Sequence, residues 1–346
     1  MDHGQFILGP EVNEVEGKLA QFTGSKHCVA VSSGTDSLLI ALMACGIGTG
    51  DEVITVPYTW ISSAEVVALL GAKPVFVDIR PDTLNMDESL LEAAISKRTK
   101  ALMPVSIYGQ CSDMDAINKI AEKYDLPVIE DGAQSFGATY KSKKSCNLST
   151  IGSTSFFPSK PLGCYGDGGA LFTNDDELAE KFRWIRVHGQ ERKHHHPILG
   201  INGRMDTIQA AILLEILEAF PEEVQKRQLL GQNYSNGLSN LEGLETPCIS
   251  ENNTSVYAQY TILSTQRGDI QLSLKQKKIP SVSYYSVPLH LQTVFKNLEY
   301  KVGDFPIAER VANESLSLPM SPYLTTQDQN LVIESIKNML VNKNST

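Results

Sequence analysis

The sequence has few features of a secreted, metal-binding or nucleic-acid-binding protein. Its six cysteines are scattered and form no Cys-x-x-Cys pair, so neither a structural zinc site nor a redox motif is predicted. We therefore expect six free thiols in a reducing cytoplasm and no bound metal. No apolar run is long enough to span a membrane, and no signal peptide is evident. The formal net charge of -10, without a cluster of Lys and Arg, argues against binding to nucleic acid.

Short apolar runs alternate with helical segments over the first half of the chain. Residues 10–23 carry apolar side chains at helical spacing and predict an amphipathic helix. The alternation that follows predicts βαβ units and a largely parallel sheet. The predicted strands are 28–31, 52–56, 74–77, 101–105 and 127–129, and the predicted helices are 36–45, 62–70, 89–95 and 114–124.

The pattern changes after residue 152. Residues 153–157 and 169–173 predict two paired strands joined by a glycine-rich loop, and helices are predicted at about 176–187 and 205–240. A strand at 256–263 and a final helix near 326–340 follow. We predict an α/β protein with a large domain over residues 1–240 and a smaller α+β domain over residues 241–346.

A turn rich in serine and glycine, residues 32–36, lies between a predicted strand and a predicted helix. Such a turn points free backbone amides at whatever precedes the helix, and phosphate is the favoured ligand. Gly34 allows an anion to approach the backbone closely. The alternative is an ordinary helix cap by Ser33 or Thr35.

Asp131 is expected at the carboxyl end of a buried strand, the edge at which open α/β sheets bind ligands. A buried carboxylate needs a partner, and the protonated ring nitrogen of a cofactor would serve. Gln134 follows three residues later and could reach the same ligand. The alternative is an aspartate that caps the next turn.

Lys160 is followed by four glycines within nine residues, which is not the pattern of a solvated surface. A lysine between an apolar strand and a glycine loop is expected to be partly desolvated, which lowers its pKa and favours Schiff-base chemistry. The alternative is a surface loop lysine. Trp60 follows a strand and could stack on a flat ring, although such a residue is more often part of the core. The run of three histidines at 194–196 is interpreted as a polar loop.

Together these residues resemble the DegT/DnrJ/EryC1/StrS sugar aminotransferases. The resemblance runs over residues 4 to 335, and four motifs occur in order: Ser-Gly-Thr-Asp, Glu-Asp-x-x-Gln, Ser-Phe-x-x-x-Lys and Gly-x-Asn-x-Arg-x-Asp. The resemblance implies the type I fold of pyridoxal 5'-phosphate (PLP) enzymes and a homodimer with shared active sites. It implies that Lys160 is the catalytic Schiff-base lysine and that the cofactor is also bound by Gly34, Thr35, Trp60, Asp131, Gln134, Ser155 and, from the neighbouring subunit, Asn202.

The resemblance further implies an amino donor, L-glutamate, and a nucleotide-linked keto sugar that faces Arg204, Tyr284 and Tyr285. The runs at 108–113, 155–169 and 255–260 are most similar to members that act on a UDP-linked 2-acetamido-3-oxo-glucuronate. Such members carry a histidine where this chain has Tyr284. A 3-oxo- or 4-oxo-6-deoxy sugar is therefore an alternative substrate. A PLP-dependent sugar dehydratase and a non-catalytic sugar-nucleotide-binding protein are two further alternatives.

Overall fold

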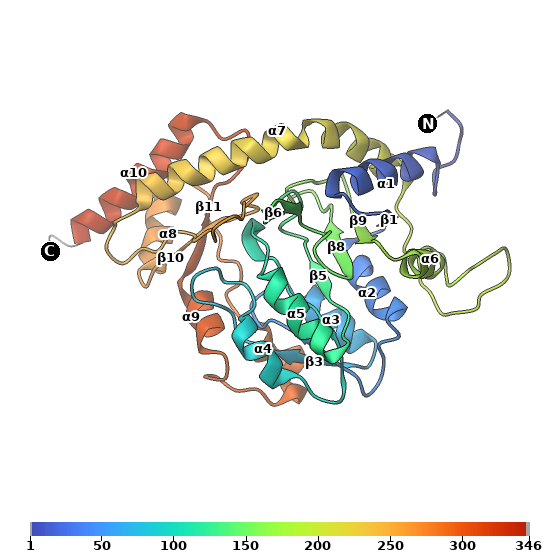
Figure 1. The fold of residues 1–346 in the computed structure, drawn as a ribbon. Helices are drawn as coiled ribbons and strands as arrows, with labels where there is room; N and C mark the ends of the chain where they lie inside the picture. The colour runs from blue at the N-terminus through green and yellow to red at the C-terminus, as the bar shows by residue number, and fades with distance from the viewer. Residues whose placement is uncertain (1, 344–346) are drawn as a thin grey trace.

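The computed structural model describes residues 2–343 and has a central sheet with helices on both faces (Figure 1). The strands run in the order β3-β2-β4 and then β5-β8-β9-β1. Backbone hydrogen bonds from Leu102 N to Pro127 O (3.0 Å) and from Asp131 N to Pro104 O (2.9 Å) join the two groups. Their bounds are β1 (His27–Val31), β2 (Glu52–Thr55), β3 (Lys73–Phe76), β4 (Thr99–Leu102), β5 (Ile129–Asp131), β8 (Ile151–Ser155) and β9 (Gly169–Thr173).

Strand direction confirms the expected α/β fold with a mostly parallel sheet. Strand β2 is parallel to β3 and β4, and β5 is parallel to β8, whereas β9 is antiparallel to both of its neighbours. Two clusters of buried apolar side chains pack between the sheet and its helices. These helices are α1 (Pro10–Thr23), α2 (Gly34–Ala44), α3 (Ser62–Leu69), α4 (Glu88–Ala94), α5 (Met114–Tyr124) and α6 (Asp176–Ile185).

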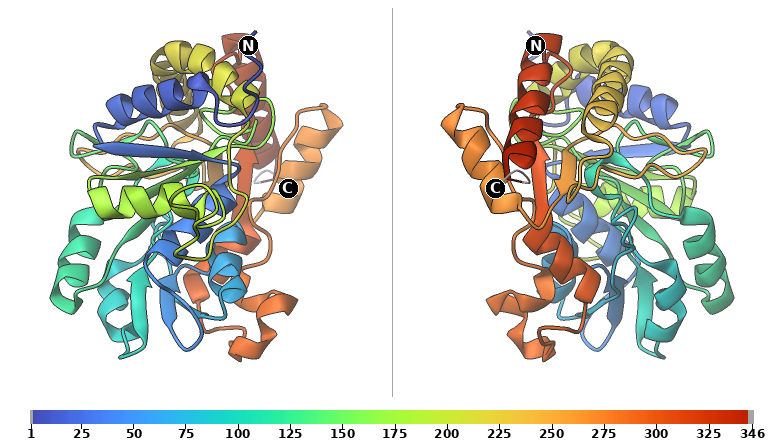
Figure 2. Two further views of the ribbon diagram at one scale, coloured as in Figure 1. Left: turned by 90° about the vertical axis from the view of Figure 1, so that its right-hand side faces the viewer. Right: turned by 90° about the vertical axis from the view of Figure 1, so that its left-hand side faces the viewer.

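A long helix, α7 (Thr207–Leu238), crosses the molecule and contributes to two cores (Figure 1). Its first half packs Leu213 and Phe220 into the core under the sheet, and its end packs Tyr234 and Leu238 into a separate C-terminal core. The C-terminal elements lie along one side of the sheet (Figure 2). They are β10 (Tyr260–Leu263), α8 (Arg267–Gln276), α9 (Pro306–Glu314), β11 (Ser315–Leu318) and α10 (Thr326–Lys343). The division into domains at residue 240 stays a prediction.

Most predicted strands are shifted by one to four residues in the structure, and for two of them the structure shows the cause. The strand expected at 256–263 begins only at Tyr260, because Tyr257 has a positive φ of 43°, which an extended strand does not allow. The strand expected at 127–129 instead covers Ile129–Asp131, because Asp131 itself pairs with the neighbouring strand. Short elements complete the chain: β6 (Thr139–Tyr140), β7 (Lys143–Lys144), and the 3-10 helices η1 (Ile107–Gly109), η2 (Leu289–Leu291) and η3 (Thr293–Leu298).

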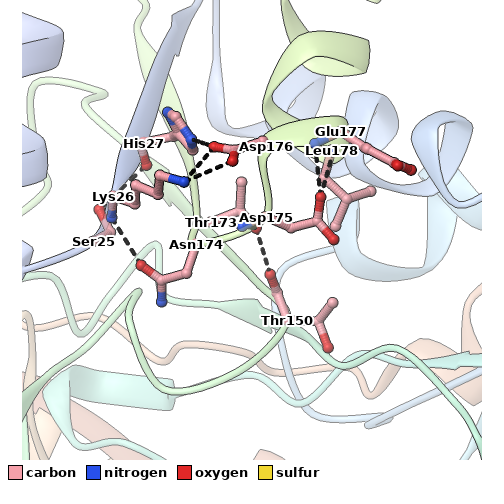
Figure 3. Close-up of polar contacts among 10 residues, drawn as sticks. All are labelled: Ser25, Lys26, His27, Thr150, Thr173, Asn174, Asp175, Asp176, Glu177 and Leu178. Atoms are coloured by element: carbon pink, nitrogen blue, oxygen red, sulfur yellow. Dashed lines mark hydrogen bonds and ion pairs between the residues drawn. The ribbon is translucent and has the colours of Figure 1, made fainter.

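Side-chain contacts fix the start of α6 against the edge strand β1 (Figure 3). Lys26 Nζ and His27 Nε2 lie 2.7 and 2.6 Å from the carboxylate oxygens of Asp176. The preceding residue, Asp175, caps the helix, since its Oδ1 accepts hydrogen bonds from the amides of residues 177 and 178. These exposed contacts hold the start of α6 beside β1.

Candidate active site

Asp131 ends strand β5 at the carboxyl edge of the sheet, as predicted, and its side chain is buried. Ser63 Oγ donates a hydrogen bond to Oδ2 (2.8 Å), and the amide of Ala133 donates one to Oδ1 (3.2 Å). Burial raises the pKa of Asp131, while these two hydrogen bonds and the charge of Lys160 act in the opposite direction. A cationic ligand group beside Asp131 would stabilise its ionised form.

Lys160 lies on the loop between β8 and β9 and is half-buried. The loop turns back on itself through a hydrogen bond from Lys160 N to Phe157 O (2.8 Å). Burial lowers the pKa of the Lys160 ammonium, and the neighbouring charge of Asp131 partly offsets this effect. The structure therefore brings together the two residues that the sequence placed on separate motifs. A desolvated amine of this kind is suited to nucleophilic chemistry.

The predicted phosphate turn is built by a close approach between α2 and β8. Helix α2 begins at Gly34, and Ser33 caps it by accepting a hydrogen bond from Asp36 N (3.0 Å). A Cβ atom on Gly34 would lie only 2.5 Å from Ser155 Cβ, so glycine is required here. The first-turn amides of a helix have no intrahelical acceptor and attract anions.

Helix α3 connects this turn to Asp131. Thr35 Oγ1 and Ser62 Oγ lie 2.8 Å apart, and the next residue, Ser63, is the donor to Asp131. Sequence reasoning missed both serines. Their position two and three residues after Trp60, at the start of a predicted helix, is the signal that could have indicated them.

Aromatic side chains form the other wall of the site. The Trp60 side chain is 58% exposed, and its ring centroid lies 6.0 Å from that of Tyr285. An exposed indole beside the site is available for stacking on a flat ligand. Gln134 Nε2 donates to the Tyr285 hydroxyl (3.3 Å), while Gln134 Oε1 accepts from the amide of Tyr108 (2.8 Å). Tyr108 was also missed from the sequence.

The segment with Asn202 and Arg204 lies beside the end of β1. Arg204 forms an isolated β-bridge with Val31, and Ser32 N donates to Gly203 O (2.9 Å). Asn202 is exposed. Among the described residues, no acceptor faces the buried Nε of Arg204. Whether these residues reach a neighbouring subunit stays a prediction.

These residues fit a phosphorylated, flat, cationic ring. The phosphate would meet the start of α2, where Gly34 and Ser155 leave no room for a larger side chain. The ring cation would meet Asp131, which two hydrogen bonds already support in its ionised form. PLP has all three of these features.

Several other expectations from the sequence can be compared with the structure. The six cysteines are free thiols. Within residues 2–343, no helix is both long and apolar enough to cross a membrane, and no group of three or more potential ligands is placed to hold a metal ion. His195 lies 2.7 Å from Glu191, a carboxylate that sequence reasoning had overlooked.

Comparison with known proteins identifies the family to which this chain is similar. The model of the DegT/DnrJ/EryC1/StrS aminotransferase family matches residues 1–337. The UDP-2-acetamido-2-deoxy-3-oxo-D-glucuronate aminotransferase of Pseudomonas aeruginosa is 55% identical over 336 residues, which cover 97% of this chain and 92% of that protein. The dTDP-3-amino-3,4,6-trideoxy-alpha-D-glucose transaminase of Streptomyces venezuelae is 37% identical over 97% of this chain and 89% of its own length.

Among solved structures, NtdA from Bacillus subtilis with the bound cofactor PMP superimposes with a TM-score of 0.91 at 32% identity, covering 98% of this chain and 79% of that one. The family match over nearly the whole chain agrees with the motifs. This chain therefore belongs to the DegT/DnrJ/EryC1/StrS aminotransferase family.

Proposed function

We propose that this aminotransferase uses PLP and transfers an amino group from L-glutamate to the 3-oxo carbon of UDP-2-acetamido-2-deoxy-3-oxo-glucuronate, as a step in surface polysaccharide biosynthesis. The placement of Lys160 beside Asp131 at the edge of the sheet is the observation that carries the chemistry. The 55% identity to the Pseudomonas aeruginosa enzyme supports the substrate. We also propose a cytoplasmic location, which the free thiols support.

Bound in this site, PLP would supply an electron sink for the carbon that loses or gains a proton. Asp131, supported by Ser63, would hold the proton on the ring nitrogen. Trp60 would cover one face of the ring and exclude water from it. The amine of Lys160, with its lowered pKa, would hold the cofactor and then move the proton at the reacting carbon. Because one site would serve both donor and acceptor, we expect ping-pong kinetics.

We propose that two copies of the chain share their active sites. The buried Nε of Arg204, which lacks an acceptor in the described part of the chain, supports a role in binding a group from outside it. Asn202 in the same motif is exposed and would reach the cofactor phosphate of the partner subunit. We expect a homodimer in analytical ultracentrifugation. A fully active monomer at nanomolar concentration would contradict shared sites.

A specific observation favours a different sugar substrate as the alternative to the 3-oxo-uronate. A uronate carries a carboxylate, which the planar guanidinium of Arg204 could engage at two points. Tyr284 offers a hydroxyl where similar enzymes carry a histidine, which favours a neutral 6-deoxy keto sugar such as that suggested by the Streptomyces venezuelae relative. We expect the highest kcat/KM with the 3-oxo-uronate. A higher value with a 3-oxo- or 4-oxo-6-deoxy substrate would overturn the substrate and leave the aminotransferase in place.

A lysine variant tests the chemistry. Lys160→Ala should still bind PLP through the phosphate turn and Asp131, but turnover should fall about 100-fold or more because no amine moves the proton. Lys144→Ala is the matched control: Lys144 is also half-buried with a pKa lowered by burial, and its Nζ donates to Gly137 O (3.1 Å). Cofactor retention and the rate of amino transfer are the two measurements. Turnover by Lys160→Ala equal to that of the control would refute the mechanism, and conversion of the sugar without an amino donor would indicate a dehydratase.

A further inference from the structure

We propose that the hydroxyl of Tyr58 positions the segment Tyr284–Tyr285 over the active site and thereby sets the affinity for the keto sugar. Tyr58 is fully buried although its side chain ends in a polar group. Its hydroxyl lies 2.5 Å from the carbonyl oxygen of Tyr284 and 3.1 Å from the amide nitrogen of Tyr285. The part of this inference that concerns the sugar rests on the proposed function.

Tyr58 stands where the C-terminal part of the chain meets the large sheet. It follows β2, and the carbonyl of the preceding Pro57 accepts a hydrogen bond from Leu289 N (2.7 Å). On the other side, the residue before this segment is tied to the C-terminal sheet: Ser283 Oγ donates to Ser315 O (2.9 Å) in the first residue of β11. The segment is thus tied to the C-terminal sheet just before Tyr284 and to Tyr58 immediately afterwards.

The Tyr58 hydroxyl both donates and accepts hydrogen bonds, so no other side chain of similar size can substitute for it. A phenol has one proton to donate and two lone pairs that accept. The amide of Tyr285 uses one lone pair of Tyr58. The single proton of Tyr58 lies within reach of both the Tyr284 carbonyl and Ser315 Oγ (2.9 Å), and the hydroxyl of Tyr108 lies 2.7 Å away. The Tyr284 carbonyl accepts from Tyr58 and also from Tyr108. Phenylalanine at position 58 would remove the acceptor of the Tyr285 amide while keeping the ring.

A change in the position of Tyr285 would alter its contacts with two residues of the candidate site. Its hydroxyl accepts a hydrogen bond from Gln134, and its ring is a neighbour of Trp60. Burial and the charge of Asp131 raise the pKa of Tyr285, so its hydroxyl remains protonated and can donate to a substrate. Tyr58 itself does not touch the reacting atoms in this scheme and is a positioning residue.

The first experiment uses the cofactor-free chain and therefore needs no turnover. The protein has two tryptophans, so a Trp184→Phe background leaves Trp60 as the reporter. We expect Tyr58→Phe in this background to shift the emission of Trp60 and to increase its quenching by iodide, because Tyr285 moves away from the indole. The matched control is Tyr234→Phe, which removes an equally buried hydroxyl that donates to Pro319 O (2.9 Å) and should leave the emission unchanged.

The second experiment separates the two halves of the reaction. In Tyr58→Phe, the KM for the keto sugar should rise about three- to tenfold, the usual effect of losing one hydrogen bond, while the half-reaction with L-glutamate changes less than about twofold. Unchanged Trp60 emission and an unchanged KM would overturn the proposal, as would equal effects of Tyr58→Phe and Tyr234→Phe. A specific change in Trp60 emission, in a protein that aminates none of the keto sugars, would refute the proposed substrate and leave the role of Tyr58 standing.

Discussion

Removal of the Ser63 hydroxyl gives a direct test of how Asp131 stays ionised. Ser63 is in the first turn of α3, is 1% exposed, and donates to Asp131 Oδ2 over 2.8 Å. Ser63→Ala deletes one oxygen and keeps the Cβ packing. Of the two hydrogen bonds described above, the carboxylate would keep the longer one, from Ala133 N (3.2 Å).

The expected size of the effect on stability follows from the negative charge of the Asp131 carboxylate that accepts the hydrogen bond. A hydrogen bond to a charged group contributes about 1.5–3 kcal/mol, so loss of the Ser63 hydroxyl should raise the pKa of Asp131 further. Burial already holds this pKa above the value in the unfolded chain. The folded chain therefore binds the proton more readily, and stability is lost as the pH rises from the unfolded pKa through the folded pKa. Ser63→Ala should increase the free energy of unfolding that is lost as the pH rises.

The assay is urea unfolding of the cofactor-free protein at several pH values. We expect Ser63→Ala to be destabilised by about 1.5–3 kcal/mol near pH 8 and by less near pH 5, where more of Asp131 is protonated. Ser112→Ala is the control: Ser112 is fully buried and donates to a neutral acceptor, Val105 O (3.1 Å). Its loss should be about 1 kcal/mol at every pH. Parallel pH curves for the two variants would refute the reasoning.

Two further predictions concern the same edge of the sheet. Gly34→Ala should destabilise the protein by about 1–3 kcal/mol and weaken PLP binding, because the new Cβ would lie 2.5 Å from Ser155 Cβ; Gly48→Ala, which meets nothing within 4 Å, is the control in thermal unfolding and cofactor titration. Burial raises the pKa of Glu130 from 4.5 to about 7, so stability should fall as the pH rises through this range. Glu130→Gln should flatten that part of the stability curve, and an unchanged slope in urea unfolding would show that Glu130 is not its source.

Sequence reasoning found the features that depend on neighbours along the chain. Apolar runs predicted the strands. Asp131 was recognised because it stands at the end of such a run, and Lys160 because four glycines follow it within nine residues. The missed residues depend on distant partners: Ser63 is 68 residues from Asp131, and Tyr58 is 257 residues from Ser315. A serine or a buried tyrosine has no pattern of its own that reveals which atom its hydroxyl will meet. The positive φ of Tyr257, which delays a strand, likewise has no signal in the sequence pattern.

Because α7 packs into both cores, its length fixes how the two cores are rotated relative to each other about the helix axis. A helix turns about 100° and rises about 1.5 Å with each residue, so Phe220 and Tyr234 face their separate cores only while the number of residues between them is kept. Deletion of a single residue in this stretch would rotate the C-terminal core by more than a quarter turn about the axis of α7. The strand β11 and the Tyr284–Tyr285 segment attached to it would turn with that core, away from the hydroxyl of Tyr58. The length of one helix is therefore part of the geometry that holds the Tyr284–Tyr285 segment beside Tyr58.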